Sequence, residues 1–447
     1  MRHDSRAGGA ASPAAPSTGP GANAHGAIWG SLAYRRLFLG MLALSYLVNF
    51  MDRQVLSILI EPIKAELHLA DWQLGTLGGI AFALFYVTLG LPIAKLSDRY
   101  NRVNIIAIAL TVWSLATAAC GLAAGFFHLL LARIGVAVGE SAGTPPAYSL
   151  IADLYEPRRR AGATGVFVAA PAVGTACGLL FGGWLGANFG WRTAFIVVAI
   201  PGLLLAVAMK LVLREPPRGF AEGRPADGEA SRVGAVARLL ATRPSFPAMA
   251  LAAGIASFSG YAMHLWLPSF FIRSHGMPVE QAGAWLALMH LAAGVFGGVA
   301  GGQVADRLGR RDPRWWMLVP CVAMLIAVPL AFLAFSTDSR TVAMIATTGL
   351  LVMYGSWAGP VYAAAQGLVG LRMRAVTISL LLFVINLIGL GLGPPLVGWA
   401  SDLLQQRAGA DSLRLALLGT APLFALSAAL YFLASRTLQR DLDAAPA

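Results

Sequence analysis

Residues 302–311 have the sequence GQVADRLGRR, and residues 94–102 have the related sequence AKLSDRYNR. Each segment lies between two long apolar stretches, one segment in each half of the chain. A short polar motif that recurs at matching positions indicates an internal duplication. The sequence therefore predicts two similar halves, each built from apolar segments joined by short polar loops.

The composition indicates that most of the chain lies in a membrane. Of its 447 residues, 57% are hydrophobic and 12% are charged, and the mean hydropathy is +0.68. The apolar stretches are roughly 20 residues long, the length that a helix needs to cross a bilayer. Backbone polar groups cannot stay unpaired in lipid, so these stretches must be helical. The predicted fold class is an all-α polytopic membrane protein with two pseudo-symmetric six-helix bundles.

The apolar stretches define twelve transmembrane helices, with boundaries that carry an error of several residues. In the first half they span residues 33–61, 72–95, 103–123, 126–152, 160–187 and 192–213. In the second half they span residues 245–272, 279–305, 315–335, 341–369, 374–401 and 413–436.

Polar segments set the domain boundaries and the expected orientation. We expect a disordered cytoplasmic tail at residues 1–30 and a first six-helix bundle at residues 31–213. A cytoplasmic linker at residues 214–243 leads to a second bundle at residues 244–440, and a short tail follows at residues 441–447. Basic residues gather in alternate loops. The positive-inside rule then places both termini in the cytoplasm. We expect the protein to lie in the inner membrane of the cell. The net charge of +12 follows from these loops, so we expect no nucleic-acid partner.

Residues 302–311 match the signature loop of the major facilitator superfamily, Gly-x-x-x-Asp-Arg-x-Gly-Arg-Arg, at every position. The chain therefore resembles that superfamily, which implies a transporter with a site near the membrane midplane between its halves. The first copy has Ala94 and Asn101 where glycines are usual. Ala94 still permits close helix approach, and Asn101 tolerates a left-handed backbone almost as glycine does.

Further motifs resemble the spinster-like branch of the superfamily. They are found at residues 49–54, 132–146, 153–160, 190–192, 214–219 and 389–394. The resemblance implies a secondary transporter of amphiphilic organic molecules, with sphingoid-phosphate or lysophospholipid substrates in animal relatives. Anion:proton symporter groups share several of these motifs, which leaves a small organic anion open as the substrate.

Four ionisable residues lie within apolar helices of the first half: Asp52, Arg53, Arg133 and Glu140. Charges at membrane depth are costly, so each needs a partner or a water-filled cavity. By helix rise, Asp52 and Arg133 lie at about the same depth and are able to meet. We predict that Asp52 and Glu140 carry proton coupling, while Arg53 and Arg133 bias their protonation and bind substrate. The alternative is an ion-pair network that only fixes two helices together.

The second half lacks such a charged cluster, and its helices carry aromatic and polar residues instead. The predicted substrate-binding residues, besides the two arginines, are Asn49, His264, Trp266, Tyr354, Tyr362 and Asn386. His290 is a second histidine at membrane depth. A lone histidine in an apolar helix is more often a packed residue than a titrating one. The cavity is expected to be charged on one wall and apolar on the other.

Glycines recur at four-residue spacing at positions 174, 178, 182 and 186, and another pair occupies positions 389 and 393. Such stripes let a neighbouring helix approach closely. We expect close helix packing at both, with helix sliding during alternating access as the further possibility.

The duplicated loops predict a cytoplasmic gate. Its residues are Asp98, Arg99, Arg102, Asp153, Arg160, Asp306, Arg307 and Arg310. We expect Asp98 and Asp306 to accept hydrogen bonds from the free amides of the helices that follow, and the arginines to pair with acids on neighbouring helix ends. The alternative is that these charges only anchor loops and set the topology.

The sequence predicts a proton-coupled secondary active transporter of a lysophospholipid- or sphingoid-like amphiphile, with proton symport of a small sugar acid or carboxylate as the alternative. An enzyme is not expected, because the sequence shows no serine paired with a histidine base, no paired intramembrane aspartates and no histidine-rich metal site. No Walker loop occurs, which disfavours ATP-driven transport. We expect no cofactor and no metal, and a monomer whose partners are its substrate, protons and membrane lipid.

Overall fold

The computed structural model describes residues 29, 31–221, 233–370 and 373–444. Every regular element within these ranges is a helix, and no strand occurs among them. The predicted tail at residues 1–30 except for Trp29, the middle of the predicted linker and the last three residues lie outside the described part. The final helix continues through residues 441–443, which the sequence assigned to a tail.

The first half begins with the long helix α2 and ends with α9, which contains two helical segments that meet at Gly190. Its helices are α2 (Leu32–Ile58), α3 (Ile60–Leu67), α4 (Asp71–Gly78), α5 (Ile80–Arg99), α6 (Arg102–Cys120), α7 (Phe126–Glu140), α8 (Thr144–Leu154) and α9 (Pro157–Val212). Pro145 and Pro146 explain why α8 starts anew after α7, because proline lacks the amide that a continuous helix requires but fits a first turn.

The second half follows α10 (Val233–Ala241) and contains two π-helical segments, η1 and η3. Its elements are α11 (Ser245–His275), α12 (Val279–Ala292), η1 (Ala293–Ala300), α13 (Gly301–Gly309), α14 (Trp315–Ser336), α15 (Arg340–Gly355), α16 (Ala358–Gly367), α17 (Arg374–Ile385), η3 (Asn386–Leu392), α18 (Gly393–Ala408), η4 (Gly409–Asp411), α19 (Ser412–Leu418) and α20 (Ala421–Asp443). Such π-helical turns are frequent at functional sites.

The helices supply the predicted membrane crossings. Nine helical runs among the described residues are long and apolar enough to cross a membrane. Two of these runs each hold two crossings, because Gly190 (φ 81°) and Gly409 (φ 53°) adopt backbone conformations that end a helix. The charged helix α2, with 27 residues, supplies the remaining one. The predicted fold class of twelve helices in two bundles is confirmed.

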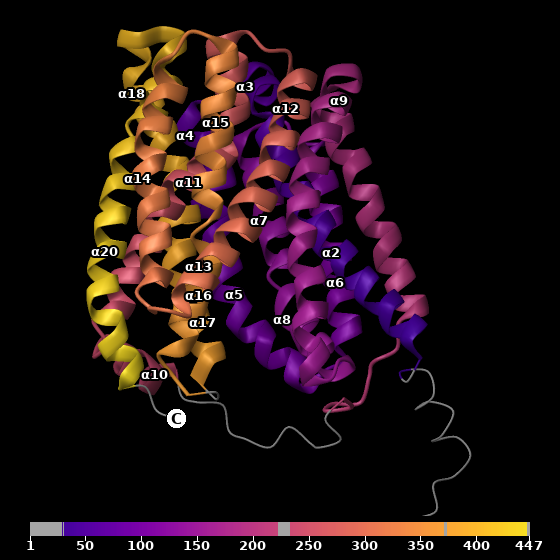
Figure 1. The fold of residues 1–447 in the computed structure, drawn as a ribbon. Coiled ribbons are helices and arrows are strands. Elements are labelled where there is room, and N and C mark those ends of the chain that lie inside the picture. The colour runs from indigo at the N-terminus through magenta and orange to yellow at the C-terminus, as the bar shows by residue number, and fades with distance from the viewer. Residues whose placement is uncertain (1–28, 30, 222–232, 371–372, 445–447) are drawn as a thin grey trace, which may run out of the picture.

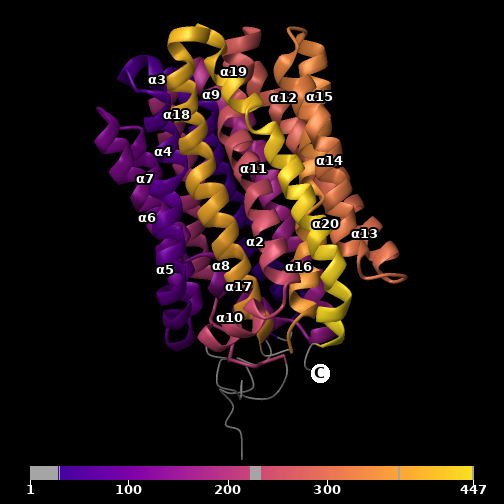
Figure 2. The same ribbon diagram turned by 90° about the vertical axis from the view of Figure 1, so that its left-hand side faces the viewer.

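The two halves stand side by side with their helices roughly parallel (Figure 1). Helix α2 begins and α20 ends on one face, which we call the terminal face; α3, α18 and the start of α12 lie at the opposite face (Figures 1 and 2). The halves meet where α2 packs against α11, α9 against α12, α4 against α18, and α5 against η3. A central site is therefore bounded by helices from both halves.

Glycines permit the tightest helix contacts in both halves. A Cβ atom added at Gly178 of α9 would lie 3.0 Å from the Met51 Cα atom of α2. One added at Gly389 of η3 would lie 2.6 Å from the Ser257 Cβ atom of α11. The predicted close packing is thus present at both stripes, and it joins the fifth crossing to the first and the eleventh to the seventh.

Replacing Gly178 with Ala should destabilise the protein, because the new methyl group overlaps the backbone of α2. We expect a loss of about 1–3 kcal/mol, typical of overpacking a filled interface, measured as a lower unfolding temperature in detergent. Gly165→Ala is the matched control, because nothing lies within 4 Å of a Cβ atom at that position of the same helix. Equal unfolding temperatures for both variants would contradict the packing account.

Candidate functional site

A buried ion pair joins α2 to α7. The Arg53 Nη2 atom lies 2.6 Å from Oε2 of Glu140, and Arg53 Nε donates to the same oxygen at 2.7 Å. The Glu140 side chain is 0% exposed and the Arg53 side chain 16% exposed. Glu140 Oε1 is buried and has no hydrogen-bond partner among the described residues. Arg53 is therefore the one ion-pair partner of this carboxylate among the described residues.

Three aromatic rings surround the Arg53 guanidinium. Its central carbon lies 4.5 Å from the ring centre of Phe82 and 5.0 Å from those of Phe50 and Tyr86. Aromatic faces attract a cation most strongly where water is excluded. Arg53 is thus held by one carboxylate on one side and by neutral rings on the others.

The other two predicted charges are buried but do not form an ion pair. Asp52 is 0% exposed and accepts a hydrogen bond from the Thr117 hydroxyl at 3.3 Å. The Arg133 guanidinium lies over Phe82, 5.4 Å from the ring centre, and its Nε atom has no described partner. The meeting of Asp52 and Arg133 expected from their depth is therefore not an ion pair in this structure.

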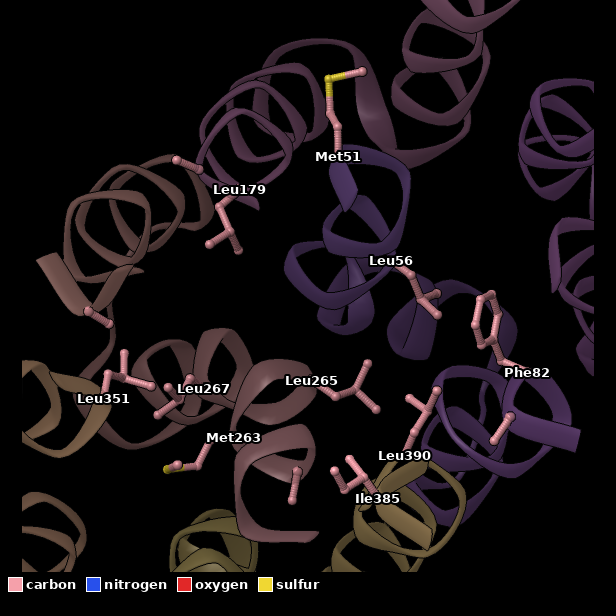
Figure 3. Packing of buried hydrophobic residues seen from close by; sticks show 14 of the residues in the cluster. Met51, Leu56, Phe82, Leu179, Met263, Leu265, Leu267, Leu351, Ile385 and Leu390 are labelled. Atoms are coloured by element: carbon pink, nitrogen blue, oxygen red, sulfur yellow. The ribbon is translucent and has the colours of Figure 1, made fainter. Parts of the chain in front are cut away.

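A cavity of about 170 Å³, called here the central cavity, opens beside Arg53. Its lining includes both arginines on one side and residues of the second half on the other. The lining residues are Phe50, Arg53, Gln54, Leu56, Ser57, Gly78, Phe82, Arg133, Tyr261, His264, Leu265, Tyr354, Leu390 and Pro394. Figure 3 shows Leu56, Phe82, Leu265 and Leu390 gathered between α2, α5, α11 and η3. The cavity thus has a cationic side and an apolar, aromatic side.

The predicted substrate-binding residues fall into two groups. His264 and Tyr354 line the central cavity with the two arginines, and Asn49 is buried beside Glu140. The other three do not line it. Trp266 is fully buried and donates to the Pro394 carbonyl at 3.0 Å. Asn386 accepts from the Tyr261 hydroxyl at 3.4 Å, and Tyr362 packs against Trp357. These three support the second-half wall from behind.

At the opposite face, an ion-pair cluster that sequence reasoning missed joins the two halves. Arg273 of α11 pairs with Asp71 of α4 at 2.7 Å and with Glu61 of α3 at 2.8 Å. Asp402 of α18 accepts hydrogen bonds from the amides of Asp71 and Trp72. Glu61, Asp71 and Arg273 lie near helix ends and Asp402 lies within α18, and the sequence gives no sign that they face one another. All ion pairs between the halves in the described part belong to this cluster.

At the terminal face, the first duplicated loop is tied to its own half. Arg102 is 1% exposed and pairs with Asp153 at 2.5 Å and with Glu215 at 2.6 Å. Asp153 also accepts from the Gly219 amide, and Arg160 donates to the Ala152 carbonyl. Arg102 therefore joins the start of the linker to the end of α8. The sequence did not reveal Glu215 as its second partner.

A helix cap follows the first duplicated loop. Asn101 caps α6 by accepting from the Asn104 amide at 2.8 Å. Asn101 has φ −66°, so it replaces the usual glycine through capping and not through a left-handed backbone. Asp98 lies in the last turn of α5, and its side chain is outside the described part. At the start of α14, the Arg314 amide donates to Asp312 Oδ1 at 2.9 Å, and no hydrogen bond among the described residues joins the Asp306 side chain to that helix.

The second duplicated loop is exposed. Asp306 and Arg307 belong to α13, Arg310 follows it, and Arg99 ends α5 in the first copy. All four side chains are exposed, and no described residue forms an ion pair with any of them. The gate residues whose side chains are described therefore do not bridge the halves, and the described part of the terminal face holds no ion pair between the halves.

Comparisons with known proteins agree with this architecture. A family model described as Major Facilitator Superfamily matches residues 42–387. An MFS-type efflux pump of Mycolicibacterium smegmatis is 33% identical over 90% of this chain and 93% of its own. The cis,cis-muconate transport protein of Acinetobacter baylyi is 29% identical over 60% of this chain and 65% of its own.

A solved structure shares the fold over nearly its whole length. It is a bacterial homolog of the human lysosomal transporter spinster, in an inward-facing and unoccupied conformation. It is 33% identical to this chain, with a TM-score of 0.83 over 92% of this chain and 99% of that protein.

Replacing Arg102 with Ala should destabilise the first half, because Asp153 and Glu215 then lose their buried partner. We expect a cost of about 2 kcal/mol, below the value for fully buried pairs because both acids are partly exposed, together with faster proteolysis of the linker. Arg99→Ala is the control, since Arg99 is exposed and unpaired among the described residues. An Arg102→Ala protein as stable and protease-resistant as Arg99→Ala would refute this role of Arg102.

Proposed function

Because this chain belongs to the major facilitator superfamily, we propose that it is a proton-coupled secondary active transporter of an amphiphilic organic anion, such as a lysophospholipid or a sphingoid phosphate. The observation that carries the proposal is the two-sided central cavity. Arg53 and Arg133 offer positive charge for a head group, and Tyr354, Leu265 and Leu390 offer an apolar surface for a hydrocarbon body.

The buried ion pair supplies a way to couple protons to the anion. An anion that enters the cavity competes with Glu140 for Arg53, the arginine that both would contact. A carboxylate that is buried and loses its cation is costly, so uptake of a proton by Glu140 favours anion binding. Asp52, buried one residue before Arg53, is the second proton acceptor. Proton and anion then bind together, which is the requirement of a symporter.

The cluster at the opposite face serves as the outer gate. Arg273 joins the halves there through Asp71 and Glu61, while the ion pairs of Arg102 at the terminal face stay within the first half. If both termini lie in the cytoplasm, the terminal face is the cytoplasmic one. A conformation whose halves are joined at the opposite face is then inward-facing. Rupture of the Arg273 pairs, and closure by the duplicated loops at the terminal face, would expose the cavity to the outside.

A small organic anion taken up with protons is the second candidate substrate. A cavity of about 170 Å³ with two arginines suits a compact carboxylate, and one relative carries the name of a muconate transporter. The two candidate substrates differ in their contact with the apolar wall: the hydrocarbon body of an amphiphile packs against it, whereas a compact dicarboxylate does not. Competition between a single-chain phospholipid and muconate for the purified protein in liposomes separates them: better displacement of a bound reporter by muconate would reverse our ranking.

Neutral replacements of the two acids should uncouple transport from the pH gradient. In liposomes with an imposed pH gradient, Glu140→Gln and Asp52→Asn should each lose roughly tenfold or more of the gradient-driven rate for a fluorescent lysophospholipid, because a permanently neutral side chain no longer exchanges a proton. Exchange of the same lipid without a gradient should persist, because the amides keep the side-chain shape.

Glu66→Gln is the matched control, since Glu66 is a carboxylate that is 50% exposed at the opposite face and pairs with Arg192. It should retain wild-type coupling. Full gradient-driven transport by both acid variants would mean that the Arg53–Glu140 pair only fastens α2 to α7.

A further inference from the structure

We propose that His264 and His290 form a second proton-binding site, which is loaded from the central cavity when an anion binds there. This inference rests on the proposed function, because it concerns protons that accompany an anion. The inference differs from the proposed function because it places a proton acceptor in the second half of the protein, on α11 and α12, away from the acids of the first half.

The two imidazole rings are in direct contact inside the protein. His290 Nε2 lies 3.2 Å from Nδ1 of His264, and the ring centres are 4.7 Å apart. His290 is 8% exposed, whereas His264 is partly exposed. The backbone of α11 is fixed at this point, because the Ser57 hydroxyl of α2 donates to the carbonyl oxygens of His264 and Leu265. The pair is thus a rigid feature of the interface between the halves.

The hydrogen bonds determine where the protons of the neutral pair lie. His290 Nδ1 is 2.8 Å from the Leu286 carbonyl oxygen, which only accepts, so this nitrogen carries a proton. In a neutral ring, Nε2 of His290 is then the acceptor, and His264 Nδ1 must donate to it. The remaining nitrogen, Nε2 of His264, keeps its lone pair. No described residue hydrogen-bonds to that atom.

The His264 side chain lies where ligands and water have access. It lines the central cavity and also a second cavity of about 230 Å³, formed between α9, α12, η1 and α15. His290 lines only the second of these two cavities. A proton that arrives at His264 Nε2 forms an N–H bond there. The Nδ1–H proton of His264 can then pass to Nε2 of His290, so that the charge moves inward while His264 becomes neutral again.

The charges around the pair explain why an anion must come with the proton. The titratable groups that face the two cavities from the neighbouring helices are Arg53 of α2, Arg133 of α7, Tyr261 of α11 and Tyr354 of α15. Helix α9, η1, η3 and α18 contribute only uncharged residues to these walls. The acids Asp52 and Glu140 lie behind, Glu140 being already paired with Arg53.

A further positive charge beside Arg133, which has no ion-pair partner among the described residues, and without a carboxylate in the described walls, is therefore unfavourable in the empty cavity. A bound anion supplies the missing negative charge. By thermodynamic linkage, anion binding then promotes protonation of the histidine pair, and protonation strengthens anion binding by the same factor.

The test uses histidine-selective ¹⁵N NMR of the full-length protein in nanodiscs, with decanesulfonate as the probe because its charge does not change with pH. The chain has seven histidines, and His264→Gln, His290→Gln and His128→Gln assign the signals. At a pH where the ligand-free pair is neutral, we expect His264 as the Nδ1–H tautomer. Addition of decanesulfonate should place one extra proton on the pair.

A binding measurement separates this site from the acids. In an Asp52→Asn/Glu140→Gln background, decanesulfonate should bind about tenfold more tightly when the pair is protonated, a factor equivalent to one pH unit of linkage. His264→Gln in the same background should remove this pH dependence, whereas His128→Gln, which changes an exposed histidine outside both cavities, should retain it.

Two results would overturn the inference: an Nε2–H tautomer of His264 in the wild-type protein, or histidine signals that show no added proton with the probe bound. Both readouts come from the wild-type protein, and the variants serve only to assign its signals. Gradient-driven transport that survives Glu140→Gln, combined with the expected histidine signals, would instead refute only the proposed role of the acids.

Discussion

The Arg53–Glu140 ion pair is the interaction on which the rest of the site depends. It places a carboxylate that is 0% exposed, and so is removed from water, against one guanidinium. The same guanidinium borders the central cavity. Any anion that binds Arg53 from the cavity must therefore alter the electrostatic balance of Glu140, and a proton is the smallest species that restores it.

The fold supports this pair through tight helix packing and one-sided closure. Glycine contacts hold α9 against α2 in the first half and η3 against α11 in the second, so the walls of the cavity are fixed by backbone proximity. The Arg273–Asp71 and Arg273–Glu61 pairs join the halves at the opposite face. Since the described part shows no ion pair between the halves at the terminal face, the two ends of the cavity are held by different kinds of contact.

Much of the fold was predictable from the sequence, because apolar runs of fixed length and a duplicated loop leave few alternatives. The pairing within the site was not. Asp52 and Arg53 are about 100° apart around α2, so the rotation of that helix decides which of them meets Glu140, and hydropathy does not report rotation. Trp266 carries no sequence sign that it faces the Pro394 carbonyl instead of the cavity. Arg273 and Asp71 are 202 positions apart, and only the folded structure brings them together.

Infrared difference spectroscopy on the purified protein tests the central claim most directly, because a protonated carboxyl group absorbs apart from a carboxylate. If anion binding to Arg53 loads Glu140 with a proton, adding decanesulfonate should produce a protonated-carboxyl band in the wild-type protein. That band should disappear in Glu140→Gln and persist in Glu66→Gln. A wild-type protein that binds the probe without this band, or a band unchanged by Glu140→Gln, would contradict the account.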